Sequence, residues 1–98
     1  MIVIRNTFQI EPDQMKQAVE LAKHHRELSK KIGFPVARIL TDLVGDFYTL
    51  VLEIEAGSMA EMEAGMQKIM TNPEWQKSYP QLRKLIRSGR REIFTVVD

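Results

Sequence analysis

The sequence predicts an α+β fold in the order β-α-β-β-α-β, with an antiparallel sheet whose helices all lie on one face. Two observations carry this prediction: apolar residues alternate with the period of a strand along residues 1–10 and 48–54, and two stretches of the chain have the helical period. A chain of 98 residues forms one domain, residues 1–98. A domain of this size hides only about two-thirds of the surface that its unfolded chain exposes, so a partner subunit would add stability.

The first strand and the first helix each carry one unexpected polar residue. In the strand expected over residues 1–10, the even-numbered side chains are apolar except for Asn6. A helix is expected over residues 11–33, with Pro12 at a first helical position. At 100° per residue, His25 falls on the apolar face of this helix. Asn6 and His25 are therefore expected in the layer where the helix meets the sheet.

A hairpin is expected in the middle of the chain. Two runs rich in β-branched and aromatic residues, FPVARIL and FYTLVLEIE, are joined through TDLVGD, which has the composition of a turn. Tyr48 is expected to alternate in phase with Leu50, Leu52 and Ile54 on the face that the helices cover.

The last third of the chain predicts two helices and a closing strand. Ser58 and Glu61 have the spacing of a capping box at the start of the second helix. Asn72 and Pro73 then signal a short extra helix, and the chain is expected to end as a strand after Gly89. This order of elements is the ferredoxin-like arrangement.

The predicted sheet has a second face that no helix covers, called here the helix-free face. It would carry the side chains of Val3, Arg5, Thr7, Phe47, Thr49, Val51 and Glu53. This mixture is more apolar than an ideal solvent face, and we expect a homodimer to bury it; the alternative is a face covered by water. Arg5 and Glu53 are expected to attract each other within the sheet or across the dimer.

Asn6 and His25 are the candidate catalytic residues. A buried amide and a buried imidazole each need hydrogen-bond partners, which a small polar pocket or a direct pair would supply. A histidine in such a pocket can also act as a base. The alternative is that both residues are purely structural. The side chains expected to line a ligand pocket are Tyr48, Met62, Met66, Trp75 and Tyr79.

Several classes of site lack support in the sequence. The chain has no cysteine, and adjacent His24 and His25 diverge by about 100° on a helix, so no metal site and no cofactor are predicted. Neither a phosphate-binding loop nor a nucleophile elbow is present. No apolar run approaches the ~18 residues that span a membrane, and the composition predicts a cytoplasmic protein.

Residues 71–98 are basic, with six Lys or Arg against three Asp or Glu, which raises the question of nucleic-acid binding. On a helix, however, Trp75 and Tyr79 fall on an apolar stripe, whereas Lys77 and Arg83 fall on the other side. Aromatic rings and basic groups separated in this way do not form a base-stacking platform. We therefore predict no nucleic-acid partner.

Residues 45–86, GDFYTLVLEIEAGSMAEMEAGMQKIMTNPEWQKSYPQLRKLI, resemble the NIPSNAP-like branch of the dimeric α/β-barrel superfamily. The resemblance rests on a Gly-containing turn that leads into a strand and on Asn-Pro-Glu-Trp late in the second helical region. It implies that two ferredoxin-like protomers pack sheet to sheet. Relatives include antibiotic-biosynthesis-type monooxygenases that act without a cofactor, haem-degrading enzymes, and members with no assigned activity.

The haem-degrading relatives use an Asn in the first strand together with a Trp and a His. Only Asn6 matches this pattern, because the strand LVLEIEAGS has no Trp and the second helix has no His. The haem site is therefore not carried over. Two functions stay open: a homodimer that binds a small apolar or aromatic ligand, as a simple binder or as a cofactor-independent monooxygenase, and a non-enzymatic module that binds a ligand or a protein.

Overall fold

The computed structural model describes residues 1–34 and 37–98. Their helices and strands are β1 (Ile2–Ile10), α1 (Met15–Lys31), β2 (Arg38–Thr41), β3 (Thr49–Ala56), α2 (Met59–Met70), α3 (Pro73–Arg83) and β4 (Ile86–Thr95). The strands form one antiparallel sheet in the order β2-β3-β1-β4. The predicted ferredoxin-like fold is confirmed, with α3 as the extra helix.

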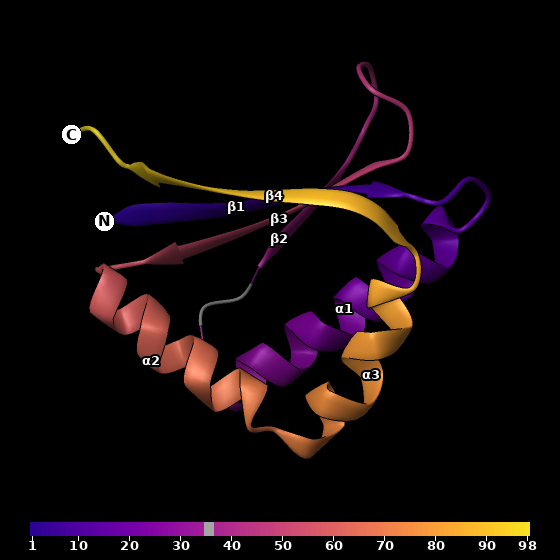
Figure 1. The fold of residues 1–98 in the computed structure, drawn as a ribbon. Coiled ribbons are helices and arrows are strands. Elements are labelled where there is room, and N and C mark those ends of the chain that lie inside the picture. Colours follow the sequence, from indigo (N-terminus) through magenta and orange to yellow (C-terminus); the bar gives the residue numbers. More distant parts are fainter. Residues whose placement is uncertain (35–36) are drawn as a thin grey trace.

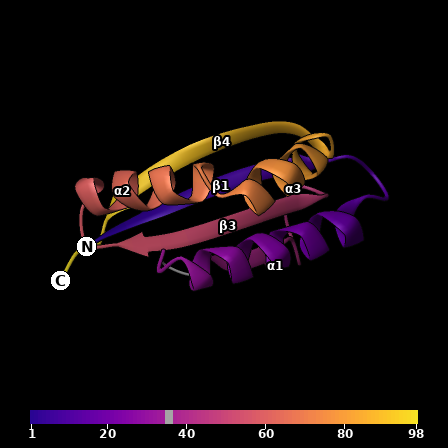
Figure 2. The same ribbon diagram turned by 90° about the horizontal axis from the view of Figure 1, so that it is seen from below.

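All three helices lie on the same side of the sheet (Figures 1 and 2). The main core fills the layer between them and consists of Ile10, Ala18, Ala22, Leu50 and Leu82. A smaller cluster of Ile4, Ala56 and Met62 lies under α2. In the described part of the chain, no helix is long and apolar enough to cross a membrane.

The register of β1 with its two neighbours decides which side chains meet the helices. Asn6 pairs with Leu52 of β3 and with Arg91 of β4. Directly opposed residues of antiparallel strands share a face, so these three side chains point toward the helices. Arg5 pairs with Glu53 and belongs to the helix-free face.

Two side-chain caps start the helices of the second half. Ser58 Oγ accepts from the Glu61 N–H at 3.2 Å, while Glu61 Oε2 accepts from the Gly57 N–H at 2.8 Å. Asn72 Oδ1 accepts from the Trp75 N–H at 3.1 Å and thereby fixes the first turn of α3. The cap signals read from the sequence are confirmed, and the second one positions Trp75.

The predicted start of the first helix is wrong, because the helix begins three residues after Pro12, the predicted first helical position. Pro12 and Asp13 form a turn, and Asp13 has a φ of 68°, which is incompatible with a helix. The Glu11 N–H donates to the carbonyl of Leu85, the residue before β4, at 2.8 Å. Glu11 is therefore still bonded to the sheet side of the fold and is not part of the helix. The helix begins only at Met15, after this contact.

The hairpin strands are shorter than predicted. β2 covers Arg38–Thr41, and residues 35 and 36 of the expected strand lie outside the described residues. β3 begins at Thr49, because Tyr48 adopts a φ of 61° and belongs to the turn. The predicted alternation therefore fails at Tyr48 but holds from Leu50 onward.

The last strand begins earlier than predicted. β4 starts at Ile86, so Gly89 lies inside the strand and not before it. Gly89 pairs with Phe8, and a Cβ atom at position 89 would lie 2.8 Å from the Phe8 ring. The glycine makes room for an aromatic neighbour here and does not end a helix.

Candidate functional site

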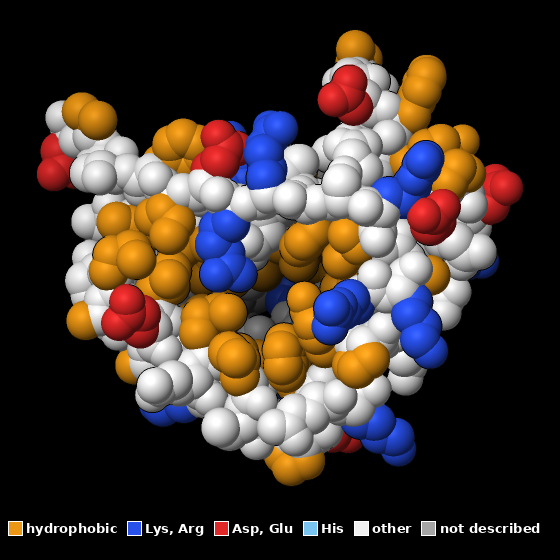
Figure 3. Space-filling view, in the orientation of Figure 1, with side chains coloured by type: hydrophobic (Ala, Val, Ile, Leu, Met, Phe, Trp, Pro, Cys, Tyr) orange, Lys and Arg blue, Asp and Glu red, His pale blue; other side chains and the backbone are white. Residues whose placement is uncertain are grey.

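A cavity of about 350 Å³ lies between the sheet and the helices. Its walls include the side chains of Phe8, Leu52, Ile54, Met66, Trp75 and Tyr79. Figure 3 shows a hollow on this side of the molecule, surrounded by hydrophobic side chains and with Lys or Arg side chains near its opening. A concave, mainly apolar space with a few polar groups is typical of small-molecule sites.

Most of the side chains expected at a site line this cavity, namely Asn6, His25, Met66, Trp75 and Tyr79. Two others do not. Tyr48 lies in the β2–β3 turn beside Phe47, with ring centroids 6.4 Å apart. Met62 is buried against Ile4 and Ala56. One turn further along α2, Met66 reaches the cavity in its place.

His25 is buried in the cavity wall, with 9% of its surface exposed. Its Nε2 atom lies 2.7 Å from Ser78 Oγ, a buried hydroxyl on α3. Burial and, to a smaller extent, the neighbouring imidazole of His24 together lower the pKa of His25 from 6.5 to about 4. The imidazole is therefore neutral at pH 7 and offers the cavity a hydrogen-bonding group without a charge.

The free energy of unfolding is expected to fall by about 3 kcal/mol as the pH drops from about 6.5 to about 4. In this window the unfolded chain takes up a proton on His25, whereas the folded chain does not. Urea unfolding at a series of pH values measures this loss of free energy, and the His25→Gln variant is expected to lose less over the same pH range. An equal dependence of the free energy of unfolding on pH in the two proteins would contradict the lowered pKa of His25. The lowered pKa of Glu53 adds a loss at lower pH that both proteins share.

Two stacked aromatic rings form part of the wall. Trp75 and Tyr79 lie one turn apart on α3, with centroids 4.5 Å apart and planes inclined by 17°. Both rings also flank His25, at centroid distances of 6.4 and 6.3 Å. The Asn72 cap and the packing of α3 against α1 hold this wall in place.

Asn6 and His25 are not bonded to each other. Asn6 Oδ1 accepts from Arg91 Nε at 2.7 Å, while His25 pairs with Ser78. Arg91 and Arg26 both line the cavity, and sequence reasoning missed them. The register of β1 with β4 would have indicated Arg91, but that register depends on starting β4 at Ile86.

A larger hollow of about 490 Å³ lies at one end of the sheet, beside Glu53, Glu55 and Glu61. The described residues that line it include no aromatic side chain and none of the predicted site residues. Across residues 1–34 and 37–98, no group of three or more His, Asp or Glu side chains is arranged to hold a metal ion. We therefore place the candidate site in the cavity under the helices.

The fold and the cavity define a ferredoxin-like α+β protein with a helix–sheet pocket. The sequence model of the NIPSNAP family matches residues 4–98, and the chain belongs to this family. The predicted resemblance is thus confirmed. A search of curated proteins found no significant match.

Solved structures share the fold at low sequence identity. A NIPSNAP family protein from Agrobacterium tumefaciens has a TM-score of 0.87 at 18% identity, with 99% of this chain and 93% of that chain covered. An uncharacterized NIPSNAP domain protein from Burkholderia xenovorans has a TM-score of 0.85 at 14% identity, covering 99% and 95%. A structure of an antibiotic biosynthesis monooxygenase has a TM-score of 0.77 at 14% identity, and both chains are covered completely.

Proposed function

We propose that the protein is a homodimer that binds a small apolar or aromatic molecule in the cavity under its helices. The observation that carries this proposal is the cavity of about 350 Å³, whose wall combines the stacked Trp75 and Tyr79 rings with only a few polar groups. A ring placed against such a wall gains about 0.5–1.5 kcal/mol beyond its burial. Neutral His25 is suited to bind a hydroxyl or carbonyl group of the ligand.

The single tryptophan of the chain, Trp75, is a built-in probe of the cavity. A panel of small apolar compounds of graded size is expected to change its emission on titration. Ala37→Phe places a ring at a lining position and is expected to weaken binding by about tenfold or more. Ala64→Phe makes the same change on the exposed side of α2 and is expected to leave binding unaltered.

The proposal fails if no compound in the panel alters the emission of Trp75. It also fails if Ala37→Phe and Ala64→Phe bind the compounds equally well, since the ligand would then lie elsewhere.

A cofactor-independent monooxygenase is the second candidate function. It is favoured by the shared fold of an antibiotic biosynthesis monooxygenase and by a histidine in the cavity wall. The low basicity of His25, however, favours ligand binding over this reaction. A phenol has a pKa of about 10, so proton transfer to a group with a pKa of about 4 is uphill by roughly 8 kcal/mol.

Oxygen uptake separates these two functions. The protein and its His25→Ala variant are supplied with a panel of hydroquinols in an oxygen electrode. Uptake by the wild-type protein that the variant loses would support the oxygenase. No uptake by either protein would leave ligand binding as the function.

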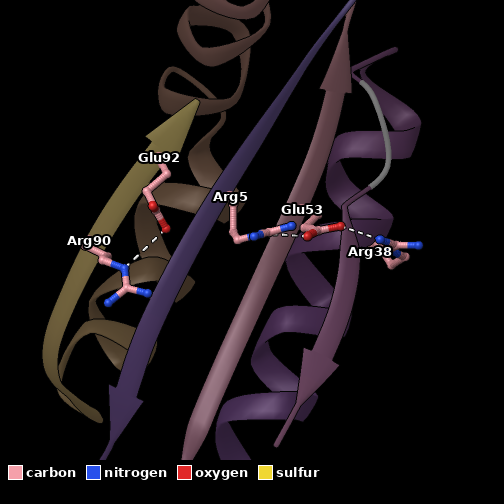
Figure 4. Close-up of polar contacts among 5 residues, drawn as sticks. All are labelled: Arg5, Arg38, Glu53, Arg90 and Glu92. Atoms are coloured by element: carbon pink, nitrogen blue, oxygen red, sulfur yellow. Dashed lines mark hydrogen bonds and ion pairs between the residues drawn. The ribbon is translucent and has the colours of Figure 1, made fainter. Parts of the chain in front are cut away.

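The helix-free face supports the homodimer through its charges. Arg5 Nε donates to Glu53 Oε2 at 2.7 Å, and Arg38 donates to the other oxygen of the same carboxylate (Figure 4). The hydrogen bonds from Arg38 and then from Arg5 hold the pKa of Glu53 below its usual value. Because Glu53 is already neutralised within the sheet, a second copy could cover it without leaving an unpaired carboxylate.

Exposed apolar side chains lie on the side of the sheet that faces away from the helices. The β2–β3 turn and the C-terminal segment both extend away from the helices (Figure 1). They carry almost fully exposed apolar residues, among them Leu43, Val44, Phe47 and Val97. A second copy seated between these two projections would bury them. A cytoplasmic location stays a prediction from composition.

A further inference from the structure

The cavity carries positive charge without an acidic partner. Arg26 of α1 and Arg91 of β4 both line it, and its described wall contains no Asp or Glu. The ion pairs found among the described residues use other arginines, namely Arg5, Arg38, Arg87 and Arg90. Among the described residues, no carboxylate therefore lies within ion-pairing distance of these two guanidinium groups beside the apolar wall.

A hydrogen bond to Asn6 orients the exposed side chain of Arg91. Its Nε donates to Asn6 Oδ1 at 2.7 Å, and the two residues are directly opposed on β4 and β1. A guanidinium carries five N–H donors, and this bond uses only the one on Nε. The two terminal nitrogens then form a planar fork that matches both oxygens of a carboxylate.

We propose that the ligand of this cavity is an organic acid, with its apolar or aromatic body against Trp75, Tyr79 and Met66 and its carboxylate on the fork of Arg91. Arg26 adds a second positive charge, and Asn6 is the positioning residue that orients Arg91. This inference rests on the proposed function and names the class of its ligand. A monoanion is favoured over a phosphate-like dianion, because the mainly apolar wall gives a second charge little solvation.

Matched pairs of acids and primary amides test the inference, because the two members differ little except in charge. The pairs are benzoate, phenylbutyrate, octanoate and adamantanecarboxylate, each with its amide, titrated near pH 7 against Trp75 emission. The acid of the tightest pair is expected to bind about 10- to 100-fold more tightly than its amide. Arg91→Gln is expected to reduce this preference to about threefold or less while leaving the affinity for the amide within about twofold.

Arg90→Gln is the matched control. It removes the same charge one residue away on the opposite face of β4, where Arg90 pairs with Glu92 at 3.3 Å (Figure 4). This variant is expected to keep the preference for the acid. Asn6→Ala is expected to lower the preference for the acid over its amide and to leave the affinity for the amide unchanged. The substitution removes the hydrogen bond that orients Arg91 but keeps the charge of Arg91.

The possible results separate the two proposals. Equal binding of acid and amide overturns the organic-acid ligand and leaves the apolar cavity intact. Equal loss of preference in the Arg90 and Arg91 variants also overturns it, since the effect would then come from net charge. Absence of binding by every acid and every amide overturns the proposed function itself.

Discussion

Replacing Leu50 by Ala is expected to lower the free energy of unfolding by about 3–5 kcal/mol. Leu50 is fully buried on β3, one of the two inner strands, and packs in the main core with Ile10 and Leu82. The truncation removes apolar contacts and leaves a hole between the sheet and the helices. This loss is a large part of the roughly 5–15 kcal/mol by which a typical domain is stable. Since each kcal/mol shifts the melting temperature of a domain of this size by about 4–8 °C, the melting temperature is expected to fall by at least about 12 °C.

Urea unfolding at one protein concentration measures this loss, because association of the subunits would otherwise enter the comparison. Leu50→Met is the control that keeps the volume, and it is expected to cost less than about 1.5 kcal/mol. A cost of less than about 1 kcal/mol for the alanine variant would contradict the placement of Leu50 in the core.

Replacing Val51 by Asp is expected to convert the proposed homodimer into monomers. Val51 follows Leu50 on β3 and points to the helix-free face, where it is opposed to Thr7 and Leu40. In a two-fold dimer the substitution places two carboxylates in the buried interface. An unpaired buried charge costs about 3–5 kcal/mol, so the dissociation constant is expected to rise by at least about a thousandfold.

Sedimentation equilibrium over a range of concentrations measures this shift. Gln67→Glu adds the same charge on the exposed side of α2 and is expected to leave the dimer unchanged. A wild-type protein that is monomeric at every concentration would rule out the homodimer. An unaltered dimer in the Val51 variant would place the interface elsewhere.

The arrangement of the faces was predictable because local patterns decide it. The alternation of β1 placed Asn6 toward the helices and Arg5 away from them, and the helical period placed His25 in the buried layer. The helix caps at Ser58 and Asn72 were also predictable from the sequence, since each joins residues only three positions apart. These features need no knowledge of distant contacts.

The features that the sequence did not reveal depend on contacts between distant segments. Tyr48 is not part of the predicted strand, because its backbone has a positive φ in the turn. Its carbonyl accepts a hydrogen bond from the Ile10 N–H at 2.8 Å. Arg91 reaches the cavity only through its pairing with Asn6, which is 85 positions away in the sequence. Neither contact has a local signal.

The most direct test of the ligand cavity is a two-dimensional amide NMR spectrum of isotope-labelled protein, recorded as the tightest-binding acid is added. The indole N–H of Trp75 and the side-chain amide of Asn6 are expected to shift together with the saturation of Trp75 emission, while signals from the β2–β3 turn stay in place. Shifts confined to that turn, or no shifts at saturating ligand, would contradict a binding site under the helices.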